Sequence, residues 1–345
     1  MKRFAACLCV ALTIYTNACF AQDKPASTEA SRKIGPVSSS LFSGAQSQEE
    51  NWTELNASKS GLDKSRIQFT VLGKSYFQDY TSEMVRVEWR EDDPIDLYVM
   101  RPHGIAEPPV ILYLYGFPAD TDRFRQEAWG KTVTKEGFAA VGFFSALTGQ
   151  RYHMRPMREW FVSELQESLG SSVHDVQMVL NYLAVRRDVD TNKVGMLGEG
   201  SGGTIGILAA TADSRIAFVD AINPWGDWPH WLKESPVVPE KERADYLKPE
   251  FFSKVAMLDP IVYLPRLEPG KIRVEQAAGD PVTPKSVRAK FAEIASAVSV
   301  IRYADASAQV AAWTRQNWWL KEQLRPSIAL PTTAEAGHEK QTSKP

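Results

Sequence analysis

The residues best suited to chemistry lie in a glycine-dense turn at positions 193–203, Lys-Val-Gly-Met-Leu-Gly-Glu-Gly-Ser-Gly-Gly. A tight turn between a strand and a helix can present a nucleophile at its apex if small residues stand two positions before and after it, as in G-x-S-x-G. The frame with glycine at both flanks puts Gly200 at the apex, which offers no attacking atom. The other frame puts Ser201 at the apex, with charged Glu199 where a small residue is needed. We expect Ser201 to begin the helix and cap its amides, and keep its role as a nucleophile as the alternative.

The elements that must position this turn alternate between strands and helices from about residue 67. Residues 84–89 alternate apolar and polar side chains, and residues 95–100 follow as the expected hairpin partner. Continuous apolar runs predict strands buried on both faces at 110–115, 138–144, 194–197, 218–222 and 272–277, with 298–303 closing the series. The clearest helix covers 172–185. This order predicts the α/β class, with a doubly wound, mostly parallel sheet and ligands beyond the carboxyl ends of its strands.

The strand, turn and helix around residues 193–210 resemble the elbow of the α/β-hydrolase fold, in the branch of dienelactone hydrolases and prolyl-oligopeptidase-like peptidases. Residues 187–190 look like the lead-in of that family, and residues 279–284 are similar to its turn with the catalytic acid, here Asp280. Tyr115-Gly116-Phe117 resembles the end of the strand that supplies an oxyanion-hole amide. The resemblance spans roughly residues 80–320 and implies an oxyanion or ligand site at Gly116, Phe117, Gly200 and Ser201.

The resemblance also implies a histidine after the last strand, where this sequence has Ala-Asp-Ala-Ser-Ala-Gln at 304–309. A serine without a general base is a poor nucleophile at neutral pH. His153 and His230 could approach the turn in space, although an ordinary structural role is the commoner one for such histidines. Only Asp280 then remains of a Ser-His-Asp triad.

Two functions follow from these residues. The first is a non-catalytic or atypical member of the fold, a pseudoenzyme, that binds a small carbonyl or carboxylate ligand. The alternative is a serine hydrolase acting on esters or peptides through Ser201, with His153 or His230 as base and Asp280 as orienter.

Two further clusters each allow two interpretations. An arginine trio could bind an anion or pair with nearby glutamates, and a tryptophan trio could line a ligand site or pack an insertion against the sheet. They are Arg151, Arg155 and Arg158, and Trp225, Trp228 and Trp231.

The composition of the 345 residues is globular, with 43% hydrophobic and 24% charged residues and a net charge of −2. Such a charge balance attracts neither nucleic acid nor anionic lipid, and five His and three Cys argue against a metal cluster. We therefore predict no metal, no cofactor, no nucleic-acid partner and no membrane span; the expected partner is a small ester, peptide or carboxylate.

The N-terminus has the pattern of a secretory signal peptide over residues 1–21, with cleavage after Ala21 and export to the periplasm or medium. Lipoprotein anchoring at Cys19 is the alternative. Because Cys7, Cys9 and Cys19 all lie in this segment, the mature chain would be free of cysteine. We expect a flexible lead-in at 22–61, one domain at 62–324 and a mobile tail at 325–345. An insertion at about 228–266, after the sixth predicted strand, would form a cap.

Overall fold

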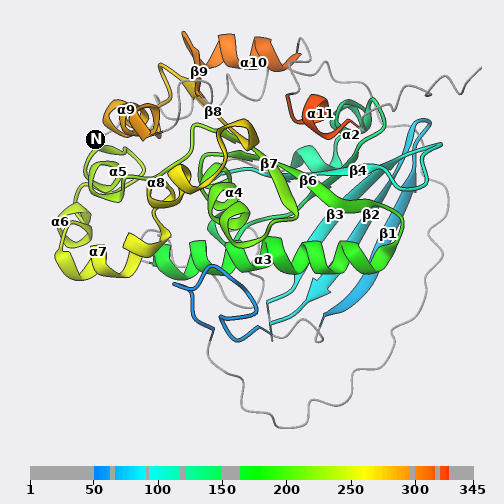
Figure 1. Cartoon of the computed structure of the whole chain (residues 1–345), viewed down its shortest axis with the longest axis horizontal. Coiled ribbons are helices and arrows are strands. Elements are labelled where there is room, and N and C mark those ends of the chain that lie inside the picture. Colours follow the sequence, from blue (N-terminus) through cyan, green and yellow to red (C-terminus); the bar gives the residue numbers. More distant parts are fainter. Residues whose placement is uncertain are drawn as a thin grey trace, which may run out of the picture. The chain divides into compact units, whose positions relative to one another are not determined.

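A computed structural model describes residues 50–62, 67–90, 93–116, 122–148, 164–294, 300–314 and 319–325. Its centre is a nine-stranded sheet in the order β1-β2-β3-β5-β4-β6-β7-β8-β9 (Figure 1). Neighbouring strands are antiparallel for β1–β2, β2–β3 and β3–β5, and parallel from β5 onwards. The strands are β1 Gln68–Tyr76, β2 Tyr80–Glu88, β3 Ile95–Pro102, β4 Pro109–Leu114, β5 Ala139–Gly142, β6 Asp190–Glu199, β7 Ile216–Ile222, β8 Ile272–Ala277 and β9 Val300–Tyr303.

Helices cover both faces of this sheet, as predicted for a doubly wound fold. Along β4, Val110, Leu112 and Leu114 belong to the core under α3 and α4, while Ile111 and Tyr113 belong to the core under α2 and α11. Because each residue of the strand faces one of these two cores, the strand is apolar at every position. The longer helices are α2 Glu127–Thr134, α3 Leu165–Arg186, α4 Ser201–Ala212, α9 Lys285–Ile294 and α10 Ala306–Thr314. The helix predicted at 172–185 thus begins seven residues earlier, and Leu165 and Leu169 of the added turns continue the buried apolar side at a spacing of four residues.

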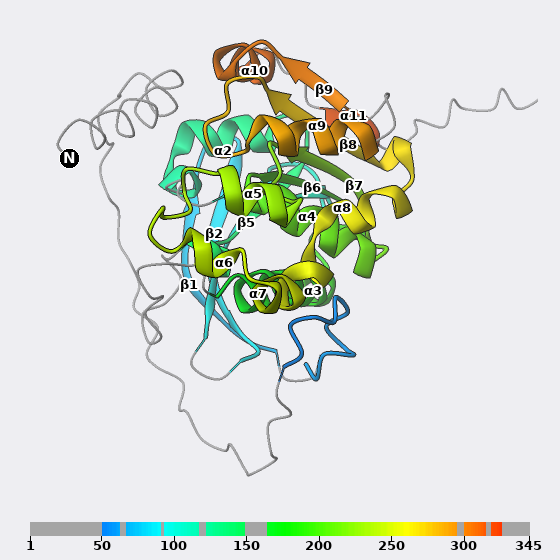
Figure 2. The same cartoon turned by 90° about the vertical axis from the view of Figure 1, so that its left-hand side faces the viewer.

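The insertion predicted at 228–266 consists mainly of short helices (Figure 2). Two of them pack on the helical layer, α7 against α3 and α8 against α4. The short helices are α5 Trp228–Glu234, α6 Arg243–Tyr246, α7 Pro249–Val255 and α8 Pro260–Tyr263. The segment follows β7, which is the sixth strand of the predicted series because β1 was not predicted. Its role as a cap stays a prediction.

The last described helix, α11 Trp319–Leu324, lies on β6 and β7. Its Lys321 is buried, and the Lys321 Nζ donates to the carbonyl oxygens of Thr132 at 3.3 Å and Lys135 at 2.6 Å, at the end of α2. Burial lowers the pKa of Lys321 to about 8. Lys321 therefore ties α11 to the end of α2 at an electrostatic cost.

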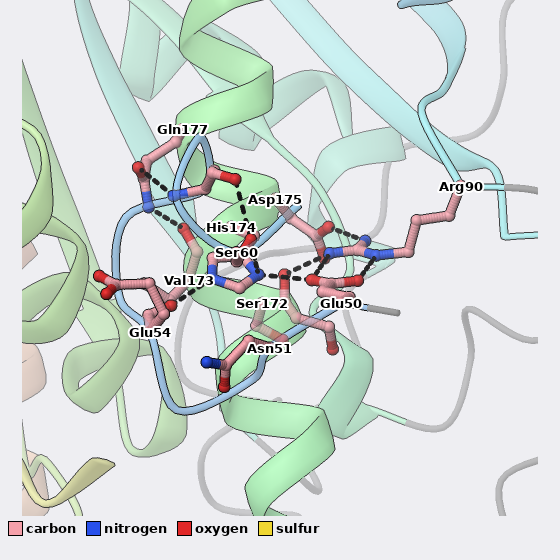
Figure 3. Close-up of polar contacts among 12 residues, drawn as sticks. Glu50, Asn51, Glu54, Ser60, Arg90, Ser172, Val173, His174, Asp175 and Gln177 are labelled. Carbon is pink, nitrogen blue, oxygen red and sulfur yellow. Dashed lines mark hydrogen bonds and ion pairs between the residues drawn. The ribbon is translucent and has the colours of Figure 1, made fainter. Parts of the chain in front are cut away.

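Residues 50–61, predicted as part of a flexible lead-in, are instead packed against α3 (Figure 3). The Glu50 carboxylate pairs with the Arg90 guanidinium at 2.5 Å and also contacts His174 Nδ1. Arg90 pairs in turn with Asp175. Burial raises the pKa of Glu50, but the hydrogen bonds and charges of Arg90 and His174 outweigh it and hold the pKa at about 2. The expectation of flexibility does not hold for residues 50–61, because the polar side chains of this segment bind buried partners.

Candidate functional site

The turn between β6 and α4 is the structural centre of the candidate site. Gly200 follows the last residue of β6 and has φ 57° and ψ −119°, a backbone conformation that side-chain-bearing residues rarely adopt. Its N–H donates to the Ile222 carbonyl oxygen at 2.8 Å, and its carbonyl oxygen accepts the first helical hydrogen bond, from Thr204 N at 3.2 Å. Ser201 is the first residue of α4 and is 0% exposed. Gly200 thus stands at the sharpest point of the turn, and the Ser201 side chain lies inside.

Contacts on either side of the turn leave no room for a side chain. A Cβ on Gly198 would lie 2.2 Å from the Gly202 carbonyl oxygen, and a Cβ on Gly202 would lie 2.2 Å from the Leu114 carbonyl oxygen. Both neighbours are backbone atoms, which cannot rotate away. A Cβ on Gly200 would have the side-chain atom Trp225 Nε1 as its nearest neighbour, at 3.2 Å, and the backbone of Gly116 no closer than 3.7 Å. The turn therefore uses the frame Gly198-Glu199-Gly200-Ser201-Gly202.

The end of β4 lies directly against this turn. A Cβ on Gly116 would come within 2.5 Å of the Glu199 carbonyl oxygen and 2.9 Å of the Ser201 nitrogen. The backbone of Gly116 and the amide of Ser201 are therefore neighbours beside the start of α4. Backbone amides at a helix start favour a negatively polarised oxygen. Phe117, the other predicted contributor, lies outside the described residues.

Glu199 supplies an acidic side chain next to the apex. Its Oε2 lies 3.7 Å from Arg123 Nη1 and is buried without a hydrogen-bond partner in the described part of the chain. The Arg123 guanidinium stacks over the Tyr115 ring at 4.5 Å. Burial raises the pKa of Glu199; the Arg123 charge opposes this, and the negative charge of Asp280 raises the pKa further. Burial therefore outweighs the nearby positive charge and makes this carboxyl group easier to protonate than one in water.

Asp280 lies in the loop after β8, where the predicted acid stands. Its Oδ1 accepts hydrogen bonds from the backbone nitrogens of Val282 at 3.0 Å and Thr283 at 2.5 Å. Burial raises the pKa of Asp280, although these hydrogen bonds and the charge of Arg288 act in the opposite direction. Asp280 follows β8 at the same end of the parallel strands as the turn after β6, so two carboxyl groups with raised pKa, Glu199 and Asp280, lie at that end.

The histidines do not complete this arrangement within the described residues. His230 sits in α5, its ring is 54% exposed, and its Nδ1 lies 2.8 Å from the Asp227 carboxylate. His153 lies outside the described residues. The segment 304–309 after β9 holds Gln309, which is buried and accepts a hydrogen bond from Asn223 Nδ2 at 3.3 Å. The Gln309 Nε2 has no partner in the described structure.

The three predicted tryptophans pack together. The rings of Trp225 and Trp231 stack at 4.8 Å, and Trp228 meets Trp231 edge-on at 5.8 Å. All three are buried, so packing of the insertion is the alternative that the structure favours. The predicted trio of arginines, Arg151, Arg155 and Arg158, lies outside the described residues.

Comparison with solved structures identifies the architecture. The acetyl xylan esterase from Paenibacillus sp. R4 superposes with a TM-score of 0.58 at 16% identity, over 75% of this chain and 89% of the other. Acetyl xylan esterase 1 from Thermoanaerobacterium sp. JW/SL YS485 gives 0.52 at 15% identity, over 72% and 86%. The chain has the α/β-hydrolase fold. No protein-family model and no curated protein matches the sequence.

Within the α/β-hydrolase fold, the structure brings Gly116, Gly200, Ser201 and Asp280 to one end of the parallel strands. Sequence reasoning missed the contacts of Glu199 with Arg123 and the buried carboxamide of Gln309. In the described residues, no group of three or more His, Cys, Asp or Glu side chains has a metal-binding arrangement. A search of the same residues finds no helix with the length and apolarity needed to span a bilayer.

Proposed function

We propose that this protein binds a small carbonyl or carboxylate ligand at the elbow of an α/β-hydrolase fold without forming an acyl-enzyme on serine. The observation that carries the proposal is the glycine at the apex, with φ 57° at Gly200 and a fully buried Ser201. A nucleophile must reach the substrate carbon from the apex, and glycine has no atom to do so.

The remaining groups of the site suit a ligand oxygen. The Ser201 amide lies beside Gly116 at the start of α4, where an oxygen with negative charge is favoured. Burial also raises the pKa of Glu199 and of Asp280, which makes each carboxyl group easier to protonate than one in water. A backbone amide held at a helix start stabilises a carbonyl or carboxylate oxygen.

Hydrolysis of an ester or peptide is the second candidate. It draws support from the acetyl xylan esterases that share the fold, although a shared fold does not carry chemistry with it. It would use Ser201, with His153 or His230 as base and Asp280 as orienter. The site would then need the Ser201 hydroxyl to leave its buried place in α4.

The two candidates differ in reaction with serine-directed reagents. We expect no labelling by a fluorophosphonate and no turnover of p-nitrophenyl acetate or acetylated xylo-oligosaccharides. Ser201→Ala is the matched control, because it removes the only hydroxyl in question. Labelling or turnover that disappears in Ser201→Ala would establish the hydrolase, and further loss in His153→Ala or His230→Ala would name the base.

Binding is tested by thermal shift with acetate, propionate, phenylacetate and the matching primary amides at millimolar concentration. A ligand at a hundred times its Kd stabilises a protein by about 2.7 kcal/mol. We expect Gly200→Ala to lose this shift, because its methyl group fills the apex. Gly104→Ala is the matched control: Gly104 also has a positive φ of 80°, but nothing lies within 4 Å of its Cβ position. Equal shifts in both variants, or none in the wild type, would contradict the proposal.

We also propose export after cleavage behind Ala21, which rests on the basic start, apolar middle and small residues of 1–21. N-terminal sequencing of the protein recovered from the periplasm or medium tests it. A mature chain that begins with lipid-modified Cys19 would favour the lipoprotein alternative.

A further inference from the structure

One end of the sheet carries an exposed apolar strand. All nine residues of β1 are exposed, whereas residues of β2 alternate between buried and half-buried. The exposed side chains include Phe69 at 55% and Tyr76 at 74%, together with Val71 and Leu72. Single exposed apolar residues are ordinary, but four within eight positions of one strand form a surface that needs an explanation.

The backbone of β1 is also open to pairing. It pairs with β2 on one side and is the terminal strand of the described sheet (Figure 1). Edge strands are usually short or protected by proline or unpaired charge. β1 has nine residues without proline, and its single charge, Lys74, is paired with Glu83 of β2 at 2.8 Å. Among the described residues, the protective feature that β1 has is a bulge, between Val71 and Gly73.

The bulge fixes which residues share a face. Opposite β2, Phe69 pairs with Val87, Val71 with Val85, Lys74 with Glu83 and Tyr76 with Thr81. The four partners are two residues apart along β2, so they lie on one face of the sheet. Phe69, Val71, Lys74 and Tyr76 therefore share that face, and Thr70 and Ser75 lie on the other.

We propose that β1 pairs antiparallel with β1 of a second copy of this chain, about a two-fold axis between Leu72 and Gly73. Only residues on the same face can stand opposite each other in a sheet, and this register satisfies that condition on both sides of the bulge. Phe69 then faces Tyr76 of the partner subunit, and Thr70 faces Ser75 of the partner subunit. Aromatic pairs and hydroxyl pairs are favourable cross-strand contacts.

The distribution of charge along β1 is also compatible with pairing to β1 of a second copy. β1 contains no acidic residue, and in this register Lys74 stands opposite Val71 of the partner subunit rather than opposite a second lysine. The two-fold symmetry repeats each contact, so the joined sheets form a closed dimer with neither β1 left at an edge.

The register makes opposite predictions for two equally polar variants. Val71→Lys would place a lysine opposite Lys74 of the partner subunit twice per dimer, so we expect the dissociation constant to rise about tenfold or more. Val71→Glu would place an opposite charge there, so we expect the dimer to persist. Val262→Lys, at an exposed valine of α8, is the control for added surface charge.

Sedimentation equilibrium of the mature chain over a concentration series measures the outcome, with thermal melts to establish that each variant is folded. The proposal is supported if the wild type and Val71→Glu are dimers and Val71→Lys is a monomer under the same conditions. A wild-type monomer at every concentration would mean that β1 has another occupant and would overturn it. A Val71→Lys dimer of unchanged affinity would place the interface elsewhere, and equal dissociation of both Val71 variants would refute the register.

Discussion

Replacing Gly200 with serine adds a hydroxymethyl group at the apex and tests the geometry of the elbow. At φ 57° and ψ −119° a residue with a side chain is strained by about 1–3 kcal/mol. The new Cβ would lie 3.2 Å from Trp225 Nε1, so the indole must shift by a few tenths of an ångström. We expect Gly200→Ser to lose about 2 kcal/mol of unfolding free energy, which for a domain of this size is a fall in Tm of roughly 3–4 °C.

Variants at two other glycines separate the contribution of backbone strain from that of the contact with Trp225. Gly104→Ser has the positive φ, 80°, without any neighbour within 4 Å, and so reports backbone strain alone. Gly270→Ser has neither the positive φ nor a neighbour, and we expect it within about 0.5 kcal/mol of the wild type. Calorimetry of the three variants gives the comparison. If Gly200→Ser melts like Gly270→Ser, the apex is not at residue 200 and Ser201 becomes the apex residue.

The same variant reports on the general base. Serine at position 200 would stand where a nucleophile belongs, but residues 304–309 contain no histidine, and the described side-chain contact of His230 is with Asp227 rather than with the turn. We therefore expect Gly200→Ser to remain unlabelled by a fluorophosphonate. Labelling of this serine would show that an imidazole reaches the apex, and would contradict the inference that the base is missing.

Three further changes test other parts of the structure. Gly198→Ala puts a methyl group 2.2 Å from the Gly202 carbonyl oxygen, and we expect a loss of about 3 kcal/mol in urea unfolding; a loss below 1 kcal/mol would contradict the tight turn. Because burial lowers the pKa of Lys321 from 10.5 to about 8, the folded chain binds fewer protons between these values, so the unfolding free energy rises with pH there. Lys321→Met should abolish this rise, measured by urea unfolding across pH 8–10.5. The pKa of Glu50 is lowered from 4.5 to about 2, so its contribution to the unfolding free energy is complete above pH 4.5 and is lost as the pH falls towards 2. Glu50→Gln should therefore weaken the dependence of the unfolding free energy on pH between 2 and 4.5. An unchanged dependence would argue against the network of Glu50, Arg90 and His174.

The sequence predicted the strands where burial constrains every position. In β4 each residue faces one of two cores, so residues 110–114 are apolar without interruption. β1 was not predicted because all nine of its residues are exposed and a bulge interrupts their alternation. Residues 50–61 were predicted as flexible because composition alone does not distinguish solvated polar groups from those, such as Glu50, that meet a buried Arg90 or His174.

At the site, the sequence predicted what depends on local spacing. Glycines at 198, 200 and 202 indicate the turn by themselves, and Asp280 follows a buried strand that is apparent from its apolar run. The ion pair of Glu199 with Arg123 and the hydrogen bond of Gln309 with Asn223 join residues 76 and 86 positions apart. Such contacts depend on how the sheet is assembled, and no pattern within a single element predicts them.

The elbow also explains why the fold can be assigned from the glycines while the reaction cannot. Gly198 and Gly202 are required by backbone atoms 2.2 Å from their Cβ positions, and Gly116 by the adjoining backbone of the turn. These constraints come from the packing of β4, β6 and α4 and do not determine which residue stands at the apex, position 200. At Gly200 the nearest neighbour of a Cβ is a tryptophan side chain at 3.2 Å, which can move. A glycine at the apex therefore relieves backbone strain and leaves the packing of the turn intact, so glycine spacing is evidence for the architecture and not for catalysis.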